Sequence, residues 1–182
     1  MNAVTSVEDL AAEVADLRDR VAAAEGALAL HELKARYAGL VDARYEAGGV
    51  VGPERLDTLA EEIADLFTPD AVWDGGSALG VAEGREAIAA RMRAPTLLFS
   101  RHLFLSPRIR VAGGRAEARW DLLAPCTTAD GTPRWLCGYE DDEYALGEDG
   151  RWRHQRMALT TVFLARADEG WRTILSRRSD DV

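Results

Sequence analysis

The stretch LKARYAGLVDARY, residues 33–45, repeats apolar and aromatic side chains at intervals of three and four residues. The series consists of Leu33, Tyr37, Leu40, Val41 and Tyr45. This period predicts a helix with one buried face. The acidic residue Asp42 has no lysine or arginine three or four positions away, so it has no partner within the helix. We expect its carboxylate to be solvated at the helix border or directed at a group elsewhere in the fold.

Another helix is predicted before this stretch, over residues 7–30. Its apolar residues alternate at spacings of four and three, as in a coiled-coil seam. They are Leu10, Val14, Leu17, Val21, Ala24 and Leu28. Because the seam covers only about three heptads, the helix is marginal alone. We expect it to pack on the body of the protein or on a second subunit, and we expect Gly26 to interrupt it before the helix that holds Asp42.

The rest of the chain predicts two helices followed by strands. Residues 53–67 and 84–94 have helical periodicity, and a short strand lies within residues 68–76. Strand-like segments separated by turn residues cover positions 99–111, 114–125, 134–146, 151–167 and 170–176. Tight turns favour antiparallel pairing. Helices followed by a run of strands indicate an α+β fold with the helices on one face of a curved sheet.

The composition limits the class of protein. The 182 residues, 47% of them hydrophobic, suffice for one domain, which we assign to residues 28–182 after an N-terminal amphipathic helix at 1–27. The net charge of −9 argues against nucleic acid or an anionic membrane as partner, because both require clustered lysine and arginine. The chain has no apolar run of about 18 residues and no signal-peptide pattern at its start, so we expect a cytoplasmic protein.

Metal and redox chemistry have little support in the sequence. Cys126 and Cys137 lack C-x-x-C spacing, and His31, His102 and His154 lack a metal-ligand pattern, so we predict reduced, packed cysteines and no metal site. The acidic run YEDDEY, at positions 139–144, alternates between the two faces of a strand, and its carboxylates cannot converge on one ion. We expect this run to be a solvated strand edge with basic partners. The segment GRWRHQR, which contains His154, indicates an exposed strand end.

Six segments, in this order, resemble a known family. They are RYAGLVD (36–42), LFTPDAVWDGG (66–76), GREAIAARM (84–92), RHLFLSPRIRV (101–111), ARWDLL (118–123) and GYEDDEYALGEDGRWR (138–153). Over about residues 28–165 the chain resembles the SnoaL-like branch of the nuclear transport factor 2-like superfamily. The resemblance implies a cone-shaped α+β barrel, in which three helices are wrapped by a strongly bent antiparallel sheet around a pocket open at one end. Relatives include scytalone dehydratases, ketosteroid isomerases, polyketide cyclases, epoxide hydrolases and dehydrohalogenases, and the fold alone does not choose among them.

The resemblance also implies a candidate active site. Dehydratase-like members pair an aspartate from the early helix with a histidine from the strand after the short third helix, often assisted by a tyrosine about one turn before the aspartate. The matching positions here are Asp42, His102 and Tyr37. His102 would act as general base, Asp42 would orient it, and Tyr37 would donate a hydrogen bond to the substrate. No cofactor is required.

Strand alternation predicts which side chains form the pocket wall. Trp120 and Leu122 share the apolar face of their strand, which places Asp121 on the polar face and outside the site. The full set of expected substrate-binding residues is Trp73, Phe104, Trp120, Leu122, Met157, Leu159 and Thr161.

The favoured hypothesis is a cofactor-independent lyase or isomerase, dehydratase-like, acting on a small apolar cyclic molecule. Two alternatives stay open: a non-catalytic protein that binds a small ligand in the same fold, and the small subunit of a ring-hydroxylating oxygenase. In each case the N-terminal helix favours an oligomer, and we expect a homodimer or homotrimer.

Overall fold

The computed structural model describes residues 6–47 and 49–169, and the strand expected at 170–176 lies outside them. The helices are α1 (Val7–Asp42), α2 (Pro53–Ala64), α3 (Gly76–Leu79) and α4 (Arg85–Arg93). The strands are β1 (Tyr45–Glu46), β2 (Gly49–Val50), β3 (Phe67–Asp74), β4 (Val81–Glu83), β5 (Leu97–Ser100), β6 (Leu103–Ala112), β7 (Arg115–Thr128), β8 (Pro133–Leu146) and β9 (Trp152–Arg166). The predicted sequence of helices followed by strands is confirmed, but the single strand expected at 99–111 is two strands, β5 and β6, and His102 lies between them. The short elements β1, β2, α3 and β4 were not predicted. None of these helices is long and apolar enough to cross a membrane.

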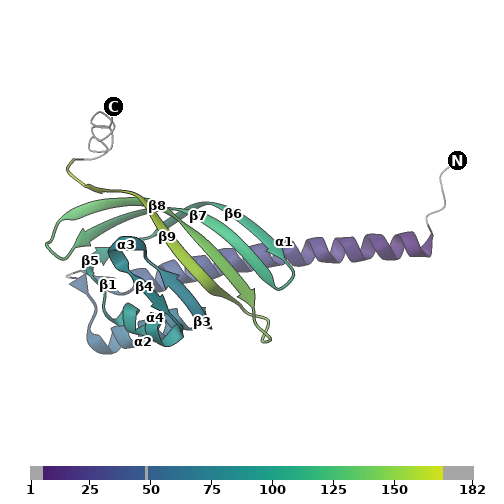
Figure 1. Ribbon diagram of the computed structural model, residues 1–182, viewed down its shortest axis with the longest axis horizontal. Helices are drawn as coiled ribbons and strands as arrows, with labels where there is room; N and C mark the ends of the chain where they lie inside the picture. Colours follow the sequence, from purple (N-terminus) through teal and green to yellow (C-terminus); the bar gives the residue numbers. More distant parts are fainter. Residues whose placement is uncertain (1–5, 48, 170–182) are drawn as a thin grey trace.

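Helix α1 is one continuous rod of 36 residues. It begins with a capping box, in which the Asp9 backbone N–H donates to Ser6 Oγ and the Asp9 carboxylate accepts from the Ser6 backbone N–H. Its N-terminal half projects away from the body, and its C-terminal half runs along the sheet (Figure 1). The expected interruption at Gly26 is wrong. Gly26 is buried, and a Cβ atom there would lie 3.0 Å from Val111 Cγ1, so glycine allows the close approach of helix and sheet.

Seven strands form one curved sheet in the order β4-β3-β9-β8-β7-β5, and β6 also pairs with β7. Every pairing is antiparallel except that of β3 with β9, which is parallel. The sheet curls over the helices (Figure 1), so the predicted α+β class is confirmed. β1 and β2 form a separate two-stranded ribbon. It begins at Tyr45, where a longer helix was expected, because α1 ends at Asp42.

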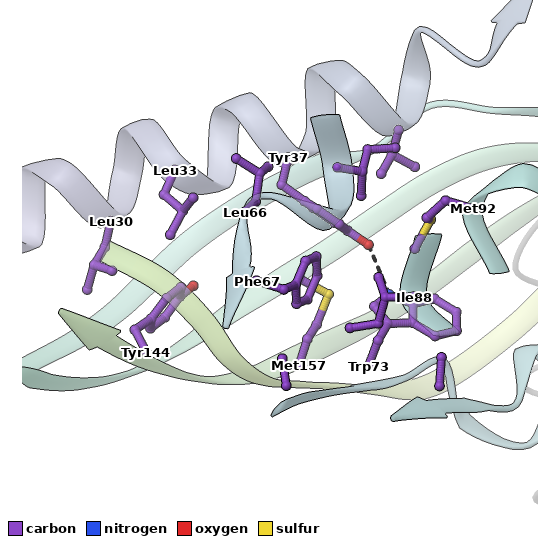
Figure 2. Close-up of a cluster of buried hydrophobic side chains, with 14 of the residues drawn as sticks. Leu30, Leu33, Tyr37, Leu66, Phe67, Trp73, Ile88, Met92, Tyr144 and Met157 are labelled. Carbon is purple, nitrogen blue, oxygen red and sulfur yellow. Dashed lines mark hydrogen bonds between the residues drawn. The ribbon is translucent and has the colours of Figure 1, made fainter. Parts of the chain in front are cut away.

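The hydrophobic core fills the space between the sheet and the helices. Figure 2 shows Leu30, Leu33 and Tyr37 pointing from α1 toward Phe67 of β3 and Met157 of β9. All five side chains are buried. This contact fixes the C-terminal half of α1, and therefore Asp42 at its end, against the sheet.

Candidate active site

A cavity opens beside this core and holds about 740 Å³ of empty space, part of it open to solvent. Its walls come from α1, β3, α4 and the sheet strands. Among the residues predicted for the site, those that line it are Tyr37, Trp73, His102, Leu122, Met157 and Leu159.

The wall residue His102 contacts Asp42, which lies behind it and does not itself line the cavity. His102 Nδ1 lies 2.7 Å from Asp42 Oδ1, and the His102 backbone N–H donates to both carboxylate oxygens, at 3.0 and 3.2 Å. The Asp42 side chain is only 5% exposed. Arg101, largely in solvent, reaches Asp42 Oδ2 at 3.4 Å. Because the carboxylate favours a proton on Nδ1, it leaves Nε2 of the ring as a proton acceptor.

Tyr37 presents a neutral hydroxyl to the cavity. The Trp73 indole N–H donates to Tyr37 Oη at 3.1 Å (Figure 2), which leaves the hydroxyl hydrogen to be donated elsewhere. Burial raises the pKa of Tyr37 strongly, and the carboxylate of Glu140 raises it further. At neutral pH the group is therefore a hydrogen-bond donor.

Three of the residues expected in the pocket wall lie outside it, so this part of the prediction is wrong. Phe104 stacks beside the His102 ring at 6.0 Å but packs against the Lys34 ammonium group, 4.2 Å from the Phe104 ring centre. Trp120 is buried in the core, where its indole N–H donates to Tyr144 Oη at 3.0 Å. Thr161 is exposed. Alternation identifies the face of a strand, but it does not show how far along that face a cavity extends.

A buried ion cluster lies next to the cavity, and the sequence analysis missed it. Lys34 of α1 contacts the carboxylates of Glu140, by a short hydrogen bond, and Asp142, at 2.7 Å, and all three side chains are at most 7% exposed. Burial lowers the pKa of Lys34, but the two carboxylates raise it more, so the lysine stays charged. Burial also raises the pKa of Asp142, to about 6. Glu140 forms part of the cavity wall.

The cluster corrects the interpretation of the acidic run as a solvated edge. β8 is an inner strand, paired with β7 on one side and β9 on the other, so one of its faces is buried. Glu140 and Asp142 occupy that face, while Asp141 points outward to Arg119. The sequence did contain one indication of a buried charge, because Lys34 lies in the buried stripe of α1, between Leu33 and Tyr37.

His154 is also corrected, because it is fully buried instead of lying at an exposed strand end. Its ring lies 4.7 Å from that of Tyr144 and 5.0 Å from that of Phe67. Burial lowers the pKa of His154, which favours the neutral ring. The pairing of β8 with β9 shifts register here: Glu143 pairs with Arg156, but the next residue, Tyr144, pairs with His154. This irregularity interrupts the alternation of buried and exposed side chains in β9 next to His154.

Two arginines bring positive charge to the cavity, and no spacing in the sequence indicated them. Arg44 is buried and donates to the carbonyl oxygens of Val41 and Met92, each at 3.1 Å. Arg91 donates to the Leu79 carbonyl at 3.2 Å, with its guanidinium 5.6 Å from the Trp73 ring centre. Burial lowers the pKa of Arg91.

The cysteines and metal-binding side chains add no further site within residues 6–47 and 49–169. Cys126 and Cys137 are free thiols, Cys126 buried in the cavity wall and Cys137 half-buried. No group of three or more His, Cys, Asp or Glu side chains in that part of the chain could hold a metal ion.

A curved, mostly antiparallel sheet packed on helices, with a cavity lined by a histidine that contacts a buried aspartate, defines an α+β domain with one candidate small-molecule site. The SnoaL-like domain family model matches residues 22–158, so the chain belongs to that family. No curated protein matches the chain in sequence.

Several solved structures share the fold. The type 2 hexachlorocyclohexane dehydrochlorinase LinA is 19% identical, with a TM-score of 0.63 over 83% of this chain and 92% of its own. A provisionally named scytalone dehydratase of Novosphingobium aromaticivorans is 21% identical, with a TM-score of 0.62 over 78% and 87% of the two chains. An NTF2-like protein with a cystatin-like fold from the same organism is 24% identical, with a TM-score of 0.58 over 88% and 92%. At these identities the likeness establishes the fold alone.

Proposed function

We propose that this protein is a cofactor-independent lyase or isomerase of the dehydratase type, acting on a small, mostly apolar cyclic molecule. The observation that carries the proposal is the 2.7 Å contact between Asp42 Oδ1 and Nδ1 of His102, whose side chain lines the cavity. Two proteins of the same fold are named for eliminations, a dehydratase and a dehydrochlorinase, which agrees with this reaction class.

The reaction begins with proton abstraction from a carbon next to a carbonyl group. His102 accepts the proton on Nε2, and the Asp42 carboxylate stabilises the imidazolium that forms. Tyr37 donates a hydrogen bond to the developing oxyanion or to the leaving oxygen. Loss of one such donor typically costs about 2.7–4 kcal/mol of transition-state stabilisation. In a dehydration, the electron pair forms the new double bond as the C–O bond breaks, and the protonated His102 gives its proton to the leaving oxygen, so that water departs. In an isomerisation, His102 returns the proton to a different carbon, which moves the double bond.

The lining supports the substrate class. Leu122, Met157 and Leu159 offer an apolar surface to a ring, and Trp73 adds an aromatic face. Glu140, in the same wall, offers a carboxylate to a substrate hydroxyl. A ring that carries a ketone and a hydroxyl group can pack on the apolar and aromatic side chains and donate its hydroxyl hydrogen to the Glu140 carboxylate.

The test compares four variants on a panel of hydroxylated cyclic ketones, with product formation followed by absorbance of the new conjugated double bond. His102→Gln is expected to lower kcat/KM by about 10² to 10⁴-fold, the usual contribution of a general base. Asp42→Asn should lower it by a smaller factor, because the base remains without its orienting carboxylate. His31→Gln and Asp141→Asn are matched controls at exposed positions that do not line the cavity, and they should keep the wild-type rate.

Retention of turnover within a factor of a few in both site variants would exclude the mechanism. A molecule that co-purifies with the wild type and is released chemically unchanged would then favour the ligand-binding alternative, and native mass spectrometry detects it.

A further inference from the structure

The N-terminal half of α1 carries an apolar seam that the body does not cover. Val7, Leu10, Val14, Leu17, Val21 and Leu28 are between 45% and 82% exposed. Of the two expected partners for this seam, the body is therefore excluded, and a second subunit remains. Most of it also precedes residue 22, where the match to the family domain begins, so it is a feature of this chain beyond the shared domain.

The seam has a heptad pattern. The a positions hold Val7, Val14, Val21 and Leu28, and the d positions hold Leu10, Leu17 and Ala24. β-Branched residues at a together with leucine at d favour two parallel strands over higher oligomers. The pattern points to a second helix with the same repeat.

The contact with the body leaves the seam free. The buried positions through which α1 packs on the body include Gly26, Leu30, Leu33 and Tyr37. Gly26 and Leu30 lie two residues before and after Leu28, which places them about 160° around the helix from the seam. Another helix can therefore pack along the seam while α1 stays attached to its own body.

The charged residues beside the seam match a parallel copy of the same helix. The g positions include Glu13 and Arg20, and the e positions include Arg18 and Glu25. In a parallel pair, each g position faces the e position five residues later in the partner. Glu13 then faces Arg18, and Arg20 faces Glu25, so both copies together form four attractive pairs and no repulsive one.

Other arrangements fit less well. An antiparallel pair overlapping from Val7 to Ala24 brings Glu13 opposite Arg20, which gives two attractive pairs in place of four. Arg20 currently lies 3.5 Å from Asp16 in its own helix. Both side chains of that pair are mostly exposed, so it contributes little and can be exchanged for a contact across the seam.

We propose that the protein forms a homodimer through a parallel two-stranded coiled coil over residues 7–28 of α1. The partner is a second copy of this chain. This proposal is independent of the proposed activity.

Sedimentation velocity over a concentration series tests the seam. The wild type should show a concentration-dependent shift from one copy to two. Leu17→Glu places a charge in the centre of the seam and should raise the dissociation constant by at least about a hundredfold. Ala15→Glu adds the same charge to an exposed position outside the seam and should dissociate like the wild type. A wild type that stays monomeric, a mass of three copies, or equal behaviour of the two variants would overturn the proposal.

Charge reversal and crosslinking test partner and orientation. The double variants Arg18→Glu/Arg20→Glu and Glu13→Arg/Glu25→Arg should each be weakened, and an equimolar mixture should recover dimers as a heterodimer. Val14→Cys lies at an a position, so in a parallel pair it meets its own copy and should form an intermolecular disulfide on mild oxidation. The wild type, with Cys126 and Cys137 alone, is the background control. A dimer without this crosslink would contradict the parallel orientation, and no recovery on mixing would contradict the charge pairing.

Discussion

Replacement of Lys34 by methionine is expected to destabilise the protein by about 3–5 kcal/mol, the typical cost of removing one partner from a buried ion pair. Lys34 lies within hydrogen-bonding distance of Glu140 and Asp142, and its side chain is 1% exposed. Methionine keeps most of the apolar stem in place, so the loss comes mainly from two carboxylates left buried without a cation. For a chain of this size the change lowers the melting temperature by roughly 6–20 °C.

The matched control is Arg119→Met. Arg119 pairs with Asp141, the residue between Glu140 and Asp142, but both side chains of that pair are about half exposed. Its removal should cost far less than that of Lys34, since exposed pairs contribute little. Both cations bind carboxylates of the same strand. The difference in lost stability between Lys34→Met and Arg119→Met therefore measures the effect of burial on an ion pair.

Urea unfolding followed by tryptophan fluorescence measures both variants. The loss in Lys34→Met should be smaller at pH 5 than at pH 8, because the buried carboxylate of Asp142 can take up a proton. The pKa of Asp142 is already raised to about 6 with Lys34 present. A loss no larger than that of Arg119→Met, or one independent of pH, would refute the assignment of a buried charge cluster.

Two further predictions concern stability. Since the folded-state pKa of Asp142 is raised to about 6 from 3.8, this residue stabilises the fold most at acid pH, and the contribution is lost as the pH rises through 6. Buried His154, whose pKa is lowered, opposes this contribution over the same range, because the unfolded chain takes up a proton there that the folded chain does not. On acidification from pH 7 to pH 5, Asp142→Asn should therefore lose more free energy of unfolding than the wild type, as measured by urea titrations at both pH values. Gly138→Ala should destabilise by about 1–3 kcal/mol, because a Cβ atom there would lie 2.3 Å from the Thr160 carbonyl oxygen. Gly114→Ala, whose added Cβ would have its nearest neighbour at 3.8 Å, is the control, and unchanged melting of Gly138→Ala would contradict the close contact.

Much of the fold could be predicted because secondary structure leaves a periodic trace in the sequence. The helical stripe of residues 33–41 and the alternation around Trp120 depend on neighbouring residues alone, and both were interpreted correctly. Gly26 was misinterpreted because a glycine that weakens an isolated helix also permits a close contact with another segment. The sequence contains no sign that Val111 lies opposite it.

The candidate site was predictable only in part. Asp42 and His102 are 60 positions apart, and family resemblance, not spacing, suggested the pair. The partners of Lys34 are more than 100 positions away, on β8. Alternation correctly separates Glu140 and Asp142 from Asp141, but it does not say which face is buried, because that depends on β8 lying between two other strands.

The sequence by itself determined the position of most long helices and strands, the α+β class and the heptad seam of α1, since each arises from interactions within a few residues of chain. Only the tertiary structure decided that the seam faces solvent, that Lys34 and His154 are buried, and that the Asp42 carboxylate contacts the His102 ring. These features depend on which distant segments share one face of the curved sheet, and burial changes the charge and hydrogen bonding of a side chain without any change in its neighbours along the chain.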